Sequence, residues 1–461
     1  MITPLTRELA RQTTQFSYKD LDQRLQLRAR MGVLDFFGVA LAGSREVLAQ
    51  IMGQTLADAG GRAQASVIGT SWRVPVANAA MLNGAAGHAL DYDDVSLALS
   101  GHPSAAVLPA ALALGEHLQC SGQDLAEAYV AGFEAACRVG RLLMPSSQDL
   151  GFHLTGVAGV FGAAAAASRL LRLDVEQTAM AFGIASSQAA GLRVEGGTMC
   201  KPLHAGRAAE AGVLAARLAQ RGFTARADAL ECDRGFLHAF SRRDAGHADD
   251  EIMSGGARYF EGSIFKFHAA CFFVHSAIEC GRLAAVQTGF AVPSAVSLWV
   301  HPETVEACSY MAPMNDLESK RSLTHAVALG ILDKRSDDPD CFGQATLADP
   351  AVVEIRGKVT VVADGSVSKT GAQLWMTTVD GMTVGTAHDA SAPSRLDAPT
   401  ISRLNAKFLA LATPVLGCKR AQALAAAVGG LQELDDVGAL MTASRVPVEA
   451  QDHQARTTLH S

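Results

Sequence analysis

Apolar residues along this chain change their spacing twice, and this change limits the folds that the chain can adopt. From residue 1 to about 265 they recur at helical spacing, as in Tyr18–Gly43. After about residue 290, two runs rich in β-branched residues, Ala295–His301 and Val359–Ala363, are typical of strands. From Thr400 to about residue 443 the helical spacing returns. The order is therefore helical, then mixed, then helical again.

Capping and turn residues mark several of these elements. Ser121-Gly-Gln-Asp124 has a capping-box pattern and opens a predicted helix. Asp174 can cap another helix that runs toward Gly191. Asp380-Gly381 separates two strand-like runs and predicts a hairpin. These signals agree with helices in the first part of the chain and a sheet in the mixed part.

We predict a mainly α fold made of two domains. Residues 1–267 are the first part of a large all-α domain, residues 268–397 a smaller α+β lid domain, and residues 398–461 the return to the all-α domain. Because helical ends flank the mixed part, the lid is an insertion, and we expect a functional site between it and the helices.

Composition excludes several classes of partner. Lys plus Arg number 39 against 46 Asp plus Glu, and no basic block occurs, which argues against nucleic acid. The longest uncharged stretches, Thr178–Leu192 and Val157–Ser168, are too short to span a membrane. With charged residues at its N-terminus, the chain is expected to be cytoplasmic. Nine cysteines without a C-x-x-C pair predict free thiols and no zinc or iron–sulfur site.

The segment from His88 to His102 is rich in groups that transfer protons. His88 and Asp91 are three residues apart, and three carboxylates crowd into Asp91–Asp94, which can raise the pKa of one of them toward the range of a general base. His102 precedes Pro103, a favoured first residue of a helix, so it should lie beside free helix amides. Two alternatives to an acid–base role remain. The segment could be a solvated acidic helix end, or His88, Asp91 and His102 could bind a metal.

Two further segments place ionisable groups at predicted helix starts. His153 lies between glycines before an Ala-rich helix, where it is suited to acid–base work, although a lone histidine is more often structural. Lys201 precedes Pro202, the expected first helical residue, and would form a carboxylate cradle with the helix amides. The Walker A pattern is absent here, and no Cys/His signature supports Cys200 as a nucleophile.

Basic and histidine-rich segments also occur near and within the predicted lid. In Phe265–His275, the residues His268, Cys271 and His275 would share one face of a helix; the alternative is a buried helix edge. Glu318–His325 is a basic helix start, or else an ordinary exposed turn. Together with the other segments, these residues suit an enzyme that moves a proton next to a carboxylate.

Five ordered blocks resemble the MmgE/PrpD family, which includes 2-methylcitrate dehydratase, cis-aconitate decarboxylase and iminodisuccinate epimerase. The resemblance covers most of the chain and therefore does not depend on a single motif. The blocks are Asn83–Asp94, Gly101–Glu116, Gly151–Ala167, Gly196–Gly212 and Phe265–His275.

The resemblance implies an all-α domain from both chain ends with an α+β lid, a homodimer, and no metal or organic cofactor. By motif match it implies catalytic roles for four residues, which would bind substrate carboxylates and shuttle protons: Asp91, His102, His153 and Lys201. We add a second set as candidate substrate-binding residues: Lys266, His268, His275 and Arg321.

Two positions depart from the family pattern. Val95 stands where many relatives have threonine, and His325 stands where many have a lid tyrosine. A histidine has a pKa nearer neutrality than a tyrosine, so His325 is a candidate second acid or base. This substitution weakens the case for a decarboxylase or an ordinary dehydratase and leaves room for an epimerase.

The sequence thus predicts a cofactor-independent lyase that removes a proton beside a carboxylate of a small di- or tricarboxylate, foremost a 2-methylcitrate dehydratase-like enzyme. An iminodisuccinate-type epimerase and a cis-aconitate decarboxylase remain alternatives. So do a non-catalytic carboxylate-binding protein and a metal-dependent hydrolase.

Overall fold

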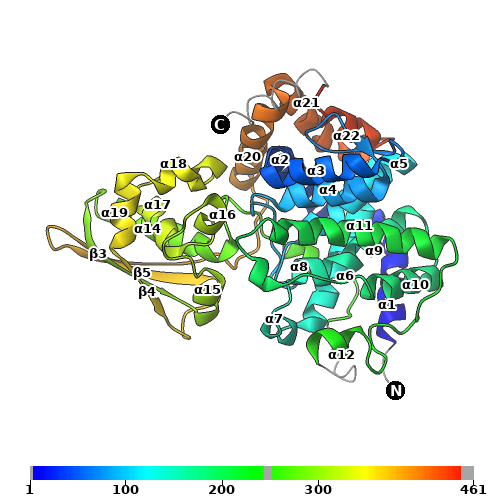
Figure 1. The fold of residues 1–461 in the computed structure, drawn as a ribbon, viewed down its shortest axis with the longest axis horizontal. Helices are drawn as coiled ribbons and strands as arrows, with labels where there is room; N and C mark the ends of the chain where they lie inside the picture. Colours follow the sequence, from blue (N-terminus) through cyan, green and yellow to red (C-terminus); the bar gives the residue numbers. More distant parts are fainter. Residues whose placement is uncertain (1–3, 243–251, 448–461) are drawn as a thin grey trace.

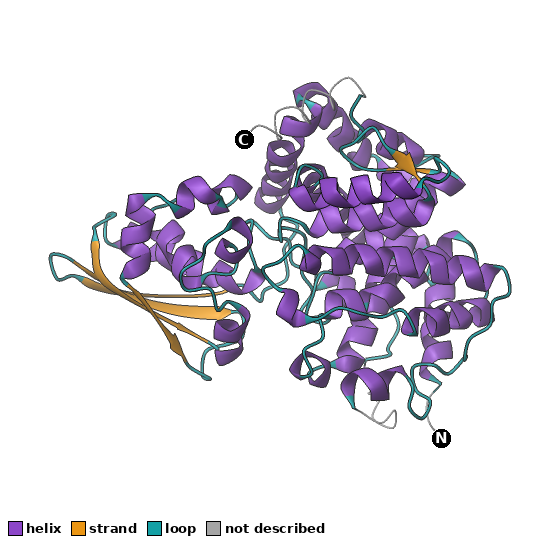
Figure 2. Ribbon diagram, in the orientation of Figure 1, coloured by secondary structure: helices purple, strands orange, loops and turns teal. Residues whose placement is uncertain are grey.

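The computed structural model describes residues 4–242 and 252–447, and within them helices predominate (Figures 1 and 2). The first part of the chain is a bundle in which α4, α5, α6, α9 and α11 pack on one another. Its helices are α1 Leu5–Gln15, α2 Gln23–Gly43, α3 Val47–Ala59, α4 Val76–His88, α5 Pro103–Leu118, α6 Gly122–Leu143, α7 Ser146–Asp149, α8 Leu154–Val157, α9 Gly159–Leu170, α10 Val175–Ser186, α11 Cys200–Gln220, α12 Phe236–Ser241 and α13 Arg258–Glu261.

A separate lobe carries the main sheet, whose strands follow the order β4-β3-β5-β6 (Figure 1). β3 pairs with β4 in parallel and with β5 antiparallel, and β5 pairs antiparallel with β6. Helices α14 and α17 pack together, and α14 contacts β5 and β6. The elements are β3 Pro293–Val300, β4 Val359–Ala363, β5 Gly371–Thr378, β6 Thr383–Asp389, α14 His275–Gln287, α15 Pro302–Ala307, α16 Asp316–Ser319, α17 Leu323–Ile331, α18 Gln344–Leu347 and α19 Pro350–Gly357.

The last helices pack against the first ones rather than against the sheet. α20 and α21 contact α2, and α22 contacts α5 (Figure 1). One hydrophobic cluster accordingly joins residues from both ends of the chain, such as Phe37 and Phe408. The C-terminal helices are α20 Ala398–Leu416, α21 Cys418–Gly429 and α22 Gly438–Ala443, and a small hairpin on the bundle consists of β1 Ala65–Ser66 and β2 Arg73–Val74.

Several local predictions are confirmed. Ser121 and Asp124 form a reciprocal capping box at the start of α6, and Asp174 caps α10. Asp380-Gly381 joins β5 to β6, with Gly381 at φ +89°, a conformation that glycine adopts without strain. Each of these residues satisfies a local requirement of the backbone. The sequence pattern that predicts it therefore does not depend on distant packing.

The helix expected over Phe265–His275 is wrong. A 3-10 turn occupies Phe272–Val274, and α14 begins only at His275. The backbone amides of this segment bond to distant carbonyls instead, Ala269 N–H to Ser336 O and Cys271 N–H to Lys320 O. Because those amides are used between segments, they cannot form a helical ladder.

Two predictions from composition concern the cysteines and the absence of membrane-spanning helices. All nine cysteines are free thiols, as predicted. None of the helices described over residues 4–242 and 252–447 is long and apolar enough to cross a membrane.

Glycines bring α4 and α11 close together, and these two helices carry residues of the candidate site. A Cβ on Gly206 of α11 would lie 2.3 Å from the carbonyl oxygen of Met81 in α4. A Cβ on Gly84 of α4 would lie 2.9 Å from Gly206 Cα. The two backbones therefore touch where neither has a side chain, which fixes the spacing between the helices.

We predict that Gly206→Ala lowers the free energy of unfolding by about 1–3 kcal/mol, because backbone atoms must move to admit the methyl group. The matched control is Gly429→Ala in α21, where a Cβ meets nothing within 4 Å. Urea unfolding of the two variants measures the difference. Equal stability of both would contradict the close contact.

Candidate active site

The connection between α4 and α5 is strained at Ser100, with φ +52°, and at Asp91. Asp91 has φ +50°, a left-handed conformation that few residues other than glycine adopt. Lys266 Nζ donates to the backbone oxygen of Asp91 at 2.7 Å, although the two residues are 175 positions apart. Strain of this kind persists only where surrounding contacts hold it, and here the contact comes from a buried lysine.

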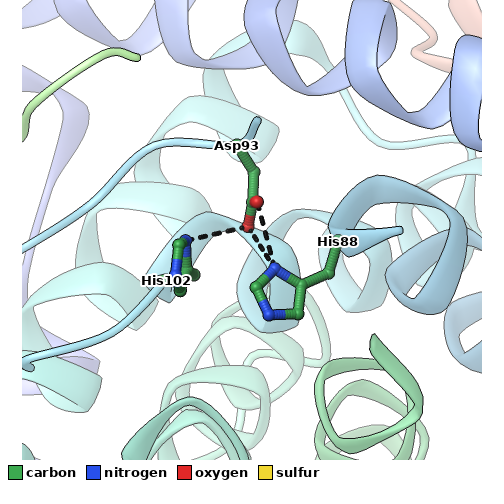
Figure 3. A group of neighbouring side chains, drawn as sticks. All are labelled: His88, Asp93 and His102. Atoms are coloured by element: carbon green, nitrogen blue, oxygen red, sulfur yellow. Dashed lines mark hydrogen bonds and ion pairs between the residues drawn. The ribbon is translucent and has the colours of Figure 1, made fainter. Parts of the chain in front are cut away.

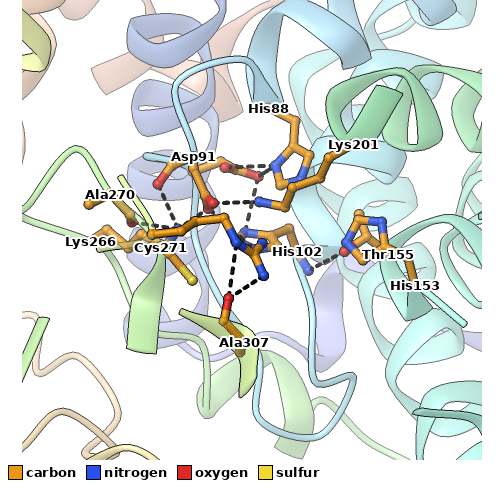
Figure 4. Close-up of polar contacts among 12 residues, drawn as sticks. His88, Asp91, His102, His153, Thr155, Lys201, Lys266, Ala270, Cys271 and Ala307 are labelled. Atoms are coloured by element: carbon orange, nitrogen blue, oxygen red, sulfur yellow. Dashed lines mark hydrogen bonds and ion pairs between the residues drawn. The ribbon is translucent and has the colours of Figure 1, made fainter. Parts of the chain in front are cut away.

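The side chain of Asp91 joins two cations (Figure 4). Lys201 Nζ lies 2.5 Å from Oδ2, and Lys266 Nζ lies 2.7 Å from Oδ1. His102 Nε2 is 3.7 Å from the same Oδ1. Burial on its own would raise the pKa of Asp91, but Lys201, Lys266 and His102 outweigh it and hold the pKa well below its usual range. Asp91 is therefore a stable carboxylate that offsets one of the two lysine charges.

A second carboxylate, Asp93, holds two histidines in place (Figure 3). His88 Nδ1 lies 2.9 Å from Asp93 Oδ2, and His102 Nδ1 lies 3.3 Å from it. His102 Nδ1 is also 3.0 Å from the Asp94 carbonyl oxygen, so a proton there would be donated to that oxygen. Burial lowers the pKa of His88 to about 4, against the effect of Asp93. His88 is thus neutral near pH 7 and donates from Nδ1.

Among the described residues, the ligand atoms of His88, Asp93 and His102 lie within 4.8 Å of one another, close enough to hold a metal ion. The hypothesis from the sequence had Asp91 in place of Asp93. The atoms that would bind a metal already pair in hydrogen bonds, and Lys201 and Lys266 lie beside them through Asp91. Hydrogen bonding accounts for the arrangement without a cation.

Asp94 lies behind this group in a wholly buried position. Ser104 Oγ donates to Asp94 Oδ2 at 2.7 Å and is itself 2.6 Å from the Tyr129 hydroxyl. Burial raises the pKa of Asp94 to about 7, with Asp93 adding to the effect and Ser104 opposing it. The three carboxylates of the Asp91–Asp94 segment thus differ in charge because their partners differ, and the crowding that the sequence indicated is relieved in this way.

His153 caps α8 and faces His204 of α11, with the two Nδ1 atoms 3.0 Å apart. Burial lowers the pKa of His153 well below its usual range, and nearby Lys201 and His88 lower it further. His153 is therefore neutral in the free protein. Since one Nδ1 must donate and the other accept, the tautomer of His153 is coupled to that of His204.

A cavity of about 310 Å³ lies between the bundle and the sheet lobe. Its polar side carries His102, His153 and Lys201 from the bundle and Arg321 from the lobe. Residues of both parts also form an apolar side. The apolar lining residues are Val95, Leu97, Met144, Phe152, Leu154, Leu192, Phe272 and Phe273.

Some of the predicted site residues line the cavity, some lie behind its wall, and the others lie elsewhere. His102, His153, Lys201 and Arg321 line the cavity, whereas Asp91 and Lys266 support Lys201 from behind it. Arg321 donates to the Ala307 carbonyl oxygen from Nε and Nη2, at 3.1 and 2.6 Å, which fixes its guanidinium at the cavity wall.

His268 and His275 line a different cavity, of about 260 Å³, near the two connections between bundle and lobe. His268 Nε2 is 2.9 Å from Glu279, and His275 Nε2 is 3.3 Å from the Ala270 carbonyl oxygen. Neither residue lines the 310 Å³ cavity, although His275 shares the Ala270 carbonyl oxygen with Lys266 of the Asp91 site.

His325 also lies apart from the cavity. Its backbone N–H donates to Ser322 Oγ at the start of α17, and its ring packs 6.1 Å from that of Phe342. Burial, and then Arg356, lower its pKa to about 4. Among the described residues that line the cavity, His325 does not appear. Its position gives no support to the acid–base role that the sequence suggested.

Some residues of the site carry no signal in the sequence that we recognised. Arg193 lines the cavity from a 3-10 turn, and nothing in its spacing marks it. The Asp-Tyr-Asp-Asp run did contain Asp93, and its pairing with His88 five residues earlier is a local signal that could have been used. Lys201 is the second residue of α11, which begins at Cys200, so Pro202 is the third helical residue rather than the first.

Comparison with known proteins identifies the family of this chain. Residues 7–247 match the model of the MmgE/PrpD N-terminal domain, and residues 268–433 match that of the MmgE/PrpD C-terminal domain. The chain therefore belongs to the MmgE/PrpD family. Both matches and the relatives below identify it as a lyase-type enzyme.

Relatives of similar length are named cis-aconitate decarboxylase. The human enzyme is 27% identical over 466 residues, covering 97% of this chain and 96% of its own. The mouse enzyme is 27% identical, with 99% and 96% covered, and one from Aspergillus terreus is 26% identical, with 97% of each chain covered. The similarity thus extends over both parts of the molecule.

We predict that Asp94 makes stability depend on pH. The folded protein keeps the Asp94 proton up to about pH 7, whereas the unfolded chain releases it near pH 4. In between, the folded state binds more protons, so this group lowers the free energy of unfolding as the pH rises, and its full penalty is present above pH 7.

Asp94→Asn removes this penalty. The stability of the variant relative to the wild type should increase between about pH 4 and pH 7, by on the order of 3 kcal/mol. Urea unfolding of both proteins across this range measures the change, and comparing the two cancels the other titrating groups. A difference that is the same at every pH would contradict the raised pKa.

Proposed function

We propose that the protein is a cofactor-independent lyase that decarboxylates a small unsaturated tricarboxylate of the cis-aconitate type. The observation that carries the proposal is one cavity in which the cations Lys201 and Arg321 and the neutral His153 face an apolar wall. The full-length similarity to cis-aconitate decarboxylases supports the same reaction.

The reaction needs charge stabilisation and one proton. When a carboxylate leaves, the electrons of its carbon–carbon bond form a new double bond. The electrons of the existing double bond move to the carbon beside another carboxylate, which becomes enediolate-like. A proton then adds to that carbon, so the overall reaction consumes one proton. Fixed cations beside the enediolate stabilise this charge.

Each residue of the cavity has a role in this scheme. Lys201, which Asp91 holds at 2.5 Å, and Arg321, which Ala307 orients, bind the carboxylates that remain. The apolar wall, including Leu154 and Phe272, receives the departing carboxylate, where poor solvation favours its loss as neutral carbon dioxide.

His153 supplies the proton in this scheme. In the free protein its pKa lies well below the usual range because of burial and of Lys201. A bound trianion adds negative charge at the same place and raises that pKa. Substrate binding therefore brings a proton to His153, and the reaction delivers it to carbon.

Dehydration of a 2-methylcitrate-like substrate is the second candidate, and one observation favours it. A neutral His153 and a cationic Lys201 on one cavity wall are a base and an acid, which could remove an α-proton and protonate a leaving hydroxyl. No such observation favours an epimerase, because that alternative depended on His325.

Proton NMR of the purified, chelator-treated protein in D₂O distinguishes the candidates. With cis-aconitate we expect release of carbon dioxide and a dicarboxylate that carries one deuterium at the new C–H position. Conversion of 2-methylcitrate to an alkene without loss of carbon would instead support dehydration. If neither substrate changes, or if turnover stops with chelation and returns with a metal, the cofactor-independent proposal is wrong.

We predict that His153→Asn lowers kcat by about 100- to 10,000-fold, the usual contribution of an acid–base group, and leaves KM within a few-fold. Arg321→Met should mainly raise KM, because the lost charge binds the ground state as well as the transition state. The matched control is His117→Asn, since His117 is exposed near the end of α5. Steady-state kinetics measure all three, and an unchanged kcat in His153→Asn would exclude its role.

A further inference from the structure

Two thiols meet at the wall of the candidate active site. Cys308 Sγ lies 4.0 Å from Cys271 Sγ, and the two residues are 37 positions apart in the chain. Cys271 lines the cavity together with Arg321, whereas Cys308 is fully buried behind it at the end of α15. One thiol is therefore accessible to a small molecule in the cavity, and the other is accessible only to its neighbour.

We propose that Cys271 and Cys308 form a peroxide-reactive dithiol whose oxidation to a disulfide switches the enzyme off. Hydrogen peroxide is small enough to enter the cavity of about 310 Å³ and reach Cys271. Cys308 is then the resolving thiol, because it is already in contact with the oxidised sulfur.

The surroundings of the two sulfurs make their roles different. The Cys308 thiol can donate to Cys271 Sγ and lowers the pKa of Cys271; burial opposes this, and Arg321 adds to the lowering. The pKa of Cys308 is raised, first by the same contact with Cys271 and then by burial. Because the thiolate is the nucleophile toward peroxide, Cys271 reacts first.

The chemistry balances with peroxide as the only oxidant. The Cys271 thiolate attacks one peroxide oxygen, the O–O bond breaks, and the second oxygen leaves as hydroxide, which takes up a proton. This step gives a sulfenic acid on Cys271. The Cys308 sulfur then gives up its proton and attacks the Cys271 sulfur, the S–O bond breaks, and a second water leaves. Both sulfurs are oxidised by one electron each, and one peroxide becomes two waters.

Closing the disulfide acts on two segments that each hold a contact of the site. The sulfurs have to approach from 4.0 Å to about 2.05 Å, which changes the side-chain torsions or the backbone of the two cysteines. Each cysteine directly follows a carbonyl that positions a cation. Ala270 O accepts from Lys266 Nζ at 3.3 Å, and Ala307 O accepts from Arg321. A shift of either segment therefore moves a cation away from its place beside Asp91 or in the cavity.

The first test is chemical and does not depend on which substrate the enzyme uses. The full chain is treated with hydrogen peroxide, its free thiols are blocked, and a non-reducing digest is analysed by mass spectrometry. We expect a Cys271–Cys308 linked peptide that disappears after treatment with dithiothreitol. Oxidation of Cys271 without this link would overturn the proposal.

The second test uses activity and a matched pair of variants. Linked wild-type protein should lose on the order of 100-fold in turnover, the effect of a misplaced site group, and regain it with dithiothreitol. Cys308→Ser should retain basal turnover, form no link, and lose activity to peroxide irreversibly, because Cys271 is oxidised beyond the sulfenic acid. Cys341→Ser, a half-buried thiol of the same lobe, should behave like the wild type.

The two tests separate this proposal from the proposed function. A linked peptide in a protein that turns over neither tricarboxylate would support the dithiol and reject the reaction. A linked protein that keeps full turnover would reject the switch and leave the reaction in place.

Discussion

The carboxylate of Asp91 between two lysines is the interaction on which the rest of the site depends. Lys266 is fully buried, and a buried cation without a partner would cost several kcal/mol. Asp91 supplies the opposite charge to Lys266 on one oxygen and to Lys201 on the other. Its left-handed backbone aims the carboxylate at both lysines, so conformational strain is exchanged for charge pairing.

This contact also joins distant parts of the chain. Asp91 follows α4, Lys201 lies at the start of α11, and Lys266 lies in the segment that leads from the bundle to the sheet lobe. The glycine contact between α4 and α11 sets the distance between the first two. The position of the cationic cavity wall thus depends on the packing of α4 against α11 and on the contact of Lys266 with Asp91.

The sequence predicted well what depends on local chemistry. The Asp124 and Asp174 caps, the hairpin at Asp380-Gly381 and the place of His102 before Pro103 each need only neighbouring residues, and the structure has all of them. The helical and mixed parts of the chain follow from apolar spacing for the same reason.

Predictions failed where distant contacts decide the conformation. Spacing alone favoured a helix through His268 and Cys271, but the amides there bond to carbonyls more than forty residues away in the lobe. The start of α17 was predicted, yet the direction of the His325 side chain depends on packing against Phe342. Arg193 could not be predicted, because only the assembled cavity gives this residue a role.

The proposed reaction requires that the cationic cavity contain a neutral histidine that takes up a proton when a trianion binds. Titration calorimetry with the unreactive analogue tricarballylate, at about pH 7.5 in two buffers of different ionisation enthalpy, measures that proton directly. We expect uptake of close to one proton per bound trianion in the wild type and much less in His153→Asn. Binding without proton uptake in the wild type would contradict it.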